Sequence, residues 1–215
     1  MKKLLLSTLS VAAIAVGSVQ AQVAQIPMVE HFTQASCGPC ASQNPTMKTT
    51  LDNFGAAGTD YVRISHQVSW PGVDPMNASF PAGPNDRRSH YGISGVPATS
   101  LNGTSDDAPN IEVTTATLTT AAALTTPYQM VATQTWNSTS SVTVDINITN
   151  TTAAPVSLAD KIYVSMMEDE VHYASAPGSN GETSFEFVMR QMYNASTGAA
   201  DATTGAALGT IAAGA

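Results

Sequence analysis

Residues 34–42, QASCGPCAS, contain both cysteines of the 215-residue chain. A pair separated by two residues can be a redox couple, half of a metal site or a small structural cross-link. A disulfide across so few residues removes little conformational entropy from the unfolded chain, so it is a poor cross-link. A zinc site needs further ligands, and the four histidines lack close His–His or His–Cys spacing. Redox chemistry by Cys37 and Cys40 is the leading interpretation, and we expect no metal site.

The N-terminus predicts export. Two lysines precede an apolar run at residues 4–16, and Val19-Gln20-Ala21 follows, with small side chains at the two positions that signal peptidase reads. Residues 1–21 therefore have the pattern of a secretory signal peptide, and their apolar run is too short to span a bilayer. We expect a periplasmic, outer-membrane-associated or secreted protein without a transmembrane segment, in a compartment where disulfides persist.

The chain is acidic and sparsely charged, with a formal net charge of −8. Without the two lysines of the signal peptide, six basic residues remain against 16 acidic ones, which gives −10. Phosphate binding needs a basic surface, so this composition argues against a nucleic-acid-binding role. The expected partners are protein thiol or disulfide substrates, or a redox partner protein.

Residues 22–126 predict an α/β domain, because strand and helix patterns alternate along them. A loop with four prolines and two glycines interrupts the pattern, and loops of this length often have a function. The predicted elements are a strand at 26–33, a helix at 40–54, a strand at 60–67, the loop at 68–84, a helix at 85–91, a strand within 95–103 and a helix at 110–125.

Residues 127–194 predict an all-β region. Alternating apolar and polar residues predict strands at 128–137, 141–150, 161–173 and 184–193, the first two as a hairpin. Four strands are few for a self-sufficient sandwich, so this region either packs on the α/β domain or is incomplete. Residues 195–215 have almost no large apolar side chains, and we expect a flexible or truncated tail.

The order strand, CxxC, helix has an electrostatic consequence. Unpaired backbone N–H groups at the start of the helix face the first sulfur and favour its thiolate. Cys37 is the expected exposed nucleophile, and Cys40, one turn later and more buried, is the residue that resolves a mixed disulfide. Gly38 allows close backbone approach, and Pro39 is tolerated in the first turn of a helix.

Together with YGISGVPATSLNG at residues 91–103, the strand–CGPC–helix pattern resembles the thioredoxin superfamily over about residues 24–125. The resemblance implies thiol–disulfide exchange through the cysteine pair, without a dissociable cofactor. It also implies a cis peptide bond before Pro97, with Pro97 packed against the CxxC and Val96 offering backbone groups to an extended substrate.

Three segments narrow the resemblance: VEHFTQASCGPCASQNP, SHQVSWPGVDPMN and RRSHYGISGVPATSLNG. As a set they resemble exported proteins of the outer-membrane protein twenty-eight-related family. The fold implied is a thioredoxin-like α/β domain followed by an all-β, sandwich-like and possibly incomplete region.

Two positions depart from the thioredoxin pattern. Ser36 stands where thioredoxins usually have a tryptophan, and Trp70 in the long loop is the candidate to replace that aromatic surface. His31 stands where thioredoxins have a buried aspartate that helps deprotonate the second cysteine, and imidazole could accept that proton. Glu30 competes for this role, because strand alternation lets only one of the two point inward. A histidine of the core or sheet edge is the alternative for His31.

The leading function is an exported thiol–disulfide oxidoreductase that exchanges disulfides with protein thiols, with reductase and oxidase directions both open. The alternative is a non-catalytic cell-surface or secreted binding or structural protein in which the CxxC is a static disulfide. Arg87 and Arg88 are expected on a solvated helix face rather than in a substrate-steering patch.

Overall fold

The computed structural model describes residues 22–103 and 108–214, so the predicted signal peptide lies outside the described residues. Its strands are β1 (Val23–Ala24), β2 (Met28–Thr33), β3 (Val62–Gln67), β4 (Ala98–Leu101), β5 (Thr125–Thr126), β6 (Tyr128–Ser138), β7 (Ser141–Asn150), β8 (Val156–His172), β9 (Ser184–Asn194) and β10 (Ala206–Ile211). Its helices are α1 (Gly38–Phe54), α2 (Pro75–Ser79), α3 (Ala82–Tyr91), α4 (Pro109–Glu112) and α5 (Thr115–Ala122).

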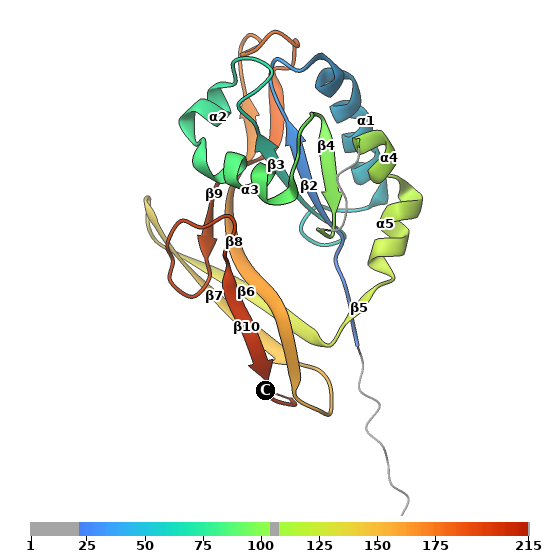
Figure 1. Cartoon of the computed structure of the whole chain (residues 1–215), viewed down its shortest axis with the longest axis vertical. Coiled ribbons are helices and arrows are strands. Elements are labelled where there is room, and N and C mark those ends of the chain that lie inside the picture. Colours follow the sequence, from blue (N-terminus) through green and yellow to red (C-terminus); the bar gives the residue numbers. More distant parts are fainter. Residues whose placement is uncertain (1–21, 104–107, 215) are drawn as a thin grey trace, which may run out of the picture.

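A six-stranded mixed sheet with the order β10-β8-β9-β3-β2-β4 forms the centre of the molecule (Figure 1). β2 is parallel to β3 and antiparallel to β4, and His31 lies opposite Ser65 on one side and Thr99 on the other. The first half of the chain is therefore a mixed α/β unit, as the alternating pattern predicts.

Helices cover both faces of the β3–β2–β4 part of the sheet. Val29 packs in one buried cluster with residues of α1 and α5, whereas Phe32 packs on the opposite face with Val68, Ile93 and Ala98. The alternation of side chains along β2 produces this division, because successive residues of a strand point to opposite faces. Figure 1 shows α1, α4 and α5 on one side of the sheet and α2 and α3 on the other.

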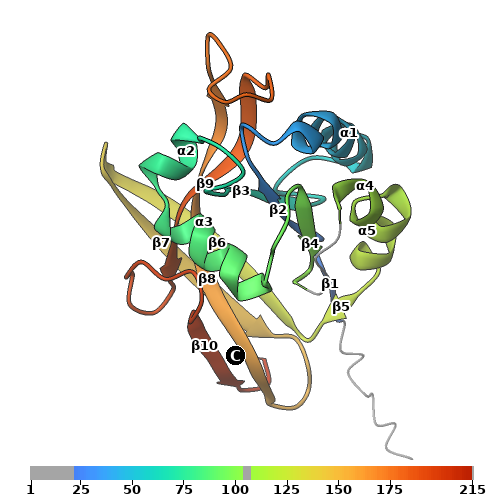
Figure 2. The same cartoon turned by 45° about the horizontal axis from the view of Figure 1, so that its top comes forward.

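The later strands extend the same sheet. β9 joins the edge of β3 in parallel orientation through the pair Ser65 and Val188, and β8 pairs antiparallel with β9 (Figure 2). The β region therefore packs on the α/β part by sharing its sheet, which is one of the arrangements expected for it. β9 satisfies backbone groups of β3 that an unpaired edge would leave exposed.

The segment expected to be a flexible or truncated tail, residues 195–215, contains β10. This strand pairs antiparallel with β8, and Ala202 and Ala206 are buried. Backbone hydrogen bonds to an existing strand do not require large apolar side chains, which is why composition alone did not indicate the strand.

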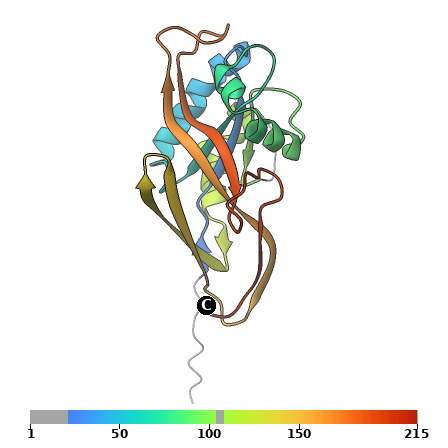
Figure 3. The same ribbon diagram turned by 90° about the vertical axis from the view of Figure 1, so that its left-hand side faces the viewer.

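The predicted hairpin at 128–150 is present as β6 and β7, which form a two-stranded sheet of their own. It projects from the main body with most of its length exposed, including Trp136 at 65% exposure (Figure 3). Its base is attached by hydrogen bonds from Tyr128 to Asp160 and from Asn150 to the carbonyl of Ile211.

Candidate functional site

The two cysteines form a disulfide at the start of α1. Cys37 is the N-cap residue of this 17-residue helix, and its Sγ accepts a hydrogen bond from the N–H of Cys40 at 3.1 Å. The sequence predicts this placement because β2 ends at Thr33 and Pro39 can begin a helix. The first sulfur therefore lies at the positive end of the helix dipole, where a thiolate is favoured.

Cys37 is not exposed, contrary to the sequence-based expectation. Its exposed fraction is 2%, and that of Cys40 is 0%. Gly38 and Pro39 are exposed, so within the CGPC motif only the two cysteines are buried. Segments that are distant in sequence converge on the disulfide and account for this burial.

The first of these segments carries Val96 and Pro97, and the peptide bond between them is cis. The carbonyl oxygen of Val96 lies 3.4 Å from Sγ of Cys37. Val96 and Trp70 each pack against the buried cluster of Phe32, Val68, Ile93 and Ala98, and the Arg88 guanidinium lies 4.6 Å from the centroid of the Trp70 ring. The structure thus brings Cys37 to the Val96–Pro97 segment, with Trp70 on the same apolar cluster as Val96.

Ser36 connects two loops beside the disulfide. Its hydroxyl donates to the carbonyl of Val73 at 2.9 Å and accepts the N–H of Ser179 at 3.2 Å. Gly72 lies so close that a Cβ there would be 2.6 Å from Cβ of Ser36. A tryptophan at position 36 would displace both loops, which gives a packing reason for the small residue.

The β8–β9 loop, residues 173–183, is a part of the site that sequence reasoning missed. Its Asn180 donates its backbone N–H to the carbonyl of Ala35 and its side-chain amide to the carbonyls of Gln34 and Cys37, all at 3.2 Å. The glycine-rich segment at 178–181 predicts a turn, but nothing local in it indicates that the turn contacts residues about 140 positions earlier.

Glu30 and His31 are both fully buried, because helices cover both faces of the sheet. The two side chains lie on opposite faces, as strand alternation predicts, but both faces are covered, so the expectation that only one of them would be buried is wrong. Glu30 bonds Arg87 of α3, and only His31 faces α1, the helix that carries Cys40. Glu30 accepts hydrogen bonds from Arg87 at 2.7 and 2.5 Å, from the Tyr91 hydroxyl at 2.9 Å and from His66 at 3.0 Å.

This network lowers the pKa of Glu30 and explains why Arg87 is buried. Burial alone would raise the pKa of Glu30, but the hydrogen bonds from Arg87 and His66 outweigh it and lower the pKa to about 2. Arg87 is 5% exposed, so it does not lie on a solvated helix face. Its guanidinium also lies 4.8 and 5.0 Å from the ring centroids of Tyr91 and Tyr163.

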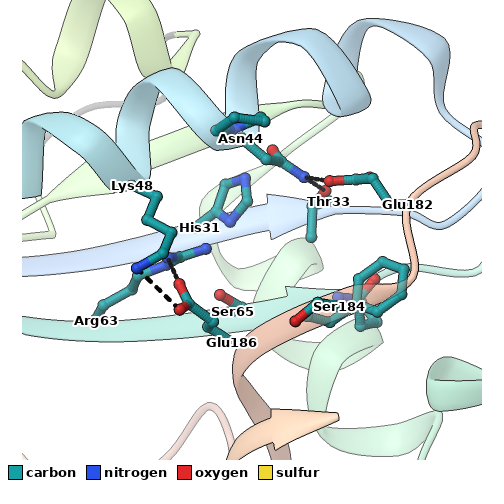
Figure 4. A pocket seen from close by; sticks show the side chains of 12 residues that line it. His31, Thr33, Asn44, Lys48, Arg63, Ser65, Glu182, Ser184 and Glu186 are labelled. Atoms are coloured by element: carbon teal, nitrogen blue, oxygen red, sulfur yellow. Dashed lines mark hydrogen bonds and ion pairs between the residues drawn. The ribbon is translucent and has the colours of Figure 1, made fainter. Parts of the chain in front are cut away.

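His31 lies on the α1 side and lines a cavity of about 210 Å³ between α1, β3 and β9 (Figure 4). Asn44, one turn after Cys40, lies above the imidazole but donates its amide to Thr33 and Glu182 instead. Burial lowers the pKa of His31 well below its usual range, and the positive charge of Arg63 adds to this effect. His31 is therefore a neutral imidazole at neutral pH.

The floor of this cavity is polar. Within the described part of the chain, buried atoms without a hydrogen-bond partner include both ring nitrogens of His31, the Ser65 hydroxyl and both side-chain polar atoms of Gln67. Arg63, Ser65 and Gln67 alternate along β3, and the sequence shows this alternation. The pattern could have indicated a polar sheet face beneath the helix.

Glu182 is a second residue that the sequence did not identify. Its carboxylate accepts the Asn44 amide at 2.8 Å and the Asn180 amide at 2.5 Å. Burial raises the pKa of Glu182, although both hydrogen bonds act in the opposite direction. A carboxyl group with a raised pKa thus forms a direct hydrogen bond with Asn44 of α1, the helix that carries Cys40.

The described residues contain neither a cluster of metal ligands nor a membrane-spanning helix. No group of three or more His, Cys, Asp or Glu side chains there has an arrangement that could hold a metal ion. No helix there has the length and apolar character needed to cross a bilayer.

Comparisons with known proteins give structural neighbours only. No family model matches the chain, and no curated protein matches it. The structure is similar to HBP35 of Porphyromonas gingivalis, with a TM-score of 0.56 and 14% identity over 83% of this chain and 60% of that protein. A protein from Agrobacterium tumefaciens has a TM-score of 0.48 and 16% identity, over 91% of this chain and 97% of that one. The chain spans 60% of the length of HBP35, and the likeness to that protein concerns the mixed α/β fold.

Proposed function

We propose that this chain is an exported thiol–disulfide oxidoreductase of the thioredoxin superfamily, acting on protein thiols or disulfides through Cys37 and Cys40. The observation that carries the proposal is the meeting of three features at one sulfur. Sγ of Cys37 lies at the N-terminus of α1, is bonded to Cys40, and is 3.4 Å from the Val96 carbonyl.

The order of elements supports the superfamily assignment. β2 leads into the CxxC helix, β3 follows in parallel, and β4 begins directly after the Val96–Pro97 cis bond and runs antiparallel to β2. The three segments that resemble the outer-membrane protein twenty-eight-related family support the narrower assignment. Export to the periplasm, the outer membrane or the medium rests on the signal-peptide pattern of residues 1–21.

The exchange is a pair of displacement steps at sulfur. A partner thiolate attacks Sγ of Cys37, the Cys37–Cys40 bond breaks, and Cys40 leaves with the electron pair and takes up a proton. A second thiolate of the partner then attacks the partner sulfur of this mixed disulfide and Cys37 leaves, so the cysteine pair gains two electrons and the partner loses them. In the reverse direction the Cys37 thiolate attacks a partner disulfide, and Cys40 loses its proton, attacks Cys37 in the mixed disulfide and releases the partner thiolate. The N–H of Cys40 and the α1 dipole stabilise negative charge on the Cys37 sulfur in both directions.

The residues around the disulfide supply substrate contacts in this proposal. The backbone of Val96, beside Cys37, is positioned to pair with an extended polypeptide segment. Trp70 is half-buried, packs against the same apolar cluster as Val96, and in this proposal offers an aromatic surface in place of the one that Ser36 lacks. Neither role requires a metal or a dissociable cofactor, because the electrons pass through the cysteine pair.

The proton acceptor for Cys40 has two candidates. His31 remains one, since it lies beneath α1 and is neutral at neutral pH, but its lowered pKa disfavours the protonated state. Glu182 has a raised pKa and is linked to α1 through Asn44. Matched variants His31→Gln and Glu182→Gln separate them, because only loss of the true acceptor shifts the pH profile of the step in which Cys40 acts.

A second function is favoured by one observation, the 2% exposure of Cys37. A buried disulfide is protected from partner thiols, as expected in a non-catalytic binding or structural protein. In that case the CxxC stabilises the start of α1 without exchanging.

The two functions are separated by an insulin-reduction assay with dithiothreitol. The exported form of the chain is compared with Cys37→Ser, Cys40→Ser and the control Ser175→Ala, whose side chain is exposed in the β8–β9 loop. The oxidoreductase predicts that both cysteine variants fall to the uncatalysed rate while the control keeps the wild-type rate. Equal rates for wild type and Cys37→Ser would support the static disulfide instead.

A further inference from the structure

The β8–β9 loop follows the backbone segment that carries the first cysteine. Asn180 binds the carbonyls of Gln34, Ala35 and Cys37, each at 3.2 Å. Ser179 donates its N–H to the Ser36 hydroxyl at 3.2 Å and its own hydroxyl to the Ser36 carbonyl at 3.4 Å. Four consecutive residues before α1 thus have hydrogen bonds to this loop.

The contact leaves no space between the two segments. A Cβ built on Gly178 would lie 2.2 Å from the carbonyl oxygen of Ala35 and 2.7 Å from the Ser36 hydroxyl. Only a residue without a side chain allows the loop to approach this closely.

Glu182, which belongs to the same loop, connects it to α1. The two N–H groups of the Asn180 amide are shared between the Glu182 carboxylate at 2.5 Å and the carbonyls of Gln34 and Cys37, and the Glu182 N–H donates to the Asn180 side-chain oxygen at 2.9 Å. Asn44 of α1 donates to the same carboxylate at 2.8 Å. The closed position is therefore fixed by polar contacts between the loop, α1 and the segment before it.

The loop has the properties of a segment that opens before the core does. It lies at the far end of the β8–β9 hairpin, above the start of α1 (Figures 1 and 2). Residues 174–176 and Ser179 are exposed, and Ser179 and Asn180 contact residues 34–37 through hydrogen bonds. Tyr173, at the base of the loop, packs against the apolar cluster that contains Ala35. Segments with few buried apolar contacts open at a lower free energy than the whole fold.

We propose that the β8–β9 loop is a cover over the Cys37–Cys40 disulfide, and that a reacting thiol reaches Cys37 only when this loop is displaced. Asn180 and Gly178 then determine how readily a thiol reaches Cys37. The rate of exchange at Cys37 is proportional to the fraction of molecules in which the loop is open. The biological meaning rests on the proposed function: a protein partner would have to replace the loop beside residues 34–37.

The proposal is tested on the disulfide of the chain itself, with dithiothreitol as the only reductant. One dithiothreitol thiolate attacks Cys37 and breaks the disulfide, and its second thiol closes a ring to release Cys37. Two protein thiols and one cyclic oxidised dithiothreitol result, so atoms and electrons balance. Quenching with N-ethylmaleimide and mass measurement give the reduction rate.

The variants are Asn180→Ala, Gly178→Ala and the control Ser175→Ala. A single hydrogen bond corresponds to roughly a three- to tenfold change in the opening equilibrium. Asn180→Ala removes two side-chain bonds to the covered segment, so reduction should become at least about tenfold faster, and Gly178→Ala should accelerate it similarly. Ser175→Ala should keep the wild-type rate. Unchanged reduction rates in folded Asn180→Ala and Gly178→Ala proteins would overturn the proposal that the loop covers the disulfide.

If a variant does not fold, hydrogen exchange of the oxidised wild type tests whether the loop opens independently of the sheet. A cover predicts that the amide protons of Ser179 and Asn180 exchange at least tenfold faster than that of Val188 in the sheet. Equal protection of all three would contradict a loop that opens separately. This experiment needs no client protein, so failure of the insulin assay and failure of the cover can be told apart.

Discussion

The carbonyl oxygen of Val96 lies 3.4 Å from Sγ of Cys37, although 59 positions separate the two residues. The pairing of β2 with β4 brings them together. β2 ends shortly before the CxxC, and the neighbouring antiparallel strand β4 begins directly after Pro97. The backbone beside the disulfide is thus fixed by the central sheet.

Ser36→Trp should not improve the activity, although tryptophan is usual at this position in thioredoxins. The side chain would collide with the loops at Gly72 and Ser179, so we expect destabilisation by about 1–3 kcal/mol, as for other overpacked sites. Urea unfolding measures the change, with Ser36→Ala as the matched control. A Ser36→Trp protein that is as stable as wild type would contradict the packing argument.

Glu30→Gln should destabilise the fold by about 3–5 kcal/mol, because it leaves Arg87 charged and buried without its carboxylate. The control is Lys48→Ala, which removes ion pairs of a half-exposed lysine and should cost no more than about 1 kcal/mol. Both values come from urea unfolding at pH 7. Similar losses in the two variants would argue against a special role for the buried network.

The acid stability of the chain should depend on Glu30. Its pKa is about 2 in the folded protein against 4.5 as the ordinary value, so its contribution is present above pH 4.5 and is lost as the pH falls toward 2. The difference corresponds to about 3 kcal/mol. The free energy of unfolding of wild type should fall through this window, and that of Glu30→Gln should fall less. Parallel curves would show that other carboxylates dominate.

His31 should make the fold less stable below neutral pH. Its folded pKa lies well below 6.5, so the unfolded chain binds a proton that the folded chain does not. Stability is therefore complete above pH 6.5 and should decrease by up to about 1.4 kcal/mol per pH unit below it. His31→Gln should remove this slope between pH 6.5 and 5. An unchanged slope in that variant would assign the effect to another group.

Local features were predictable from the sequence because neighbouring residues determine them. The strand before Gln34, the helix that begins within CGPC and the cis bond at Val96–Pro97 belong to this class, the last through a resemblance. The hairpin at 128–150 was equally local, since its strands alternate and are adjacent in sequence.

Long-range contacts were not predictable in the same way. The parallel pairing of β9 with β3 depends on one register contact between Ser65 and Val188, and sequence patterns do not specify which edge a strand joins. The carbonyl of Cys37 accepts a hydrogen bond from Asn180, whose own sequence neighbourhood indicates only a turn. Arg87 was expected in solvent because its partner Glu30 is 57 positions away.

Covalent trapping tests the central claim, exchange at Cys37, most directly. The Cys40→Ser variant, reduced and freed of reductant, is incubated with oxidised insulin, and adducts are identified by peptide mass measurement. The oxidoreductase account predicts a stable mixed disulfide on Cys37 in this variant, and none above background in Cys37→Ser, where only Cys40 remains. Absence of an adduct on Cys37, or equal adducts in the two variants, would contradict it.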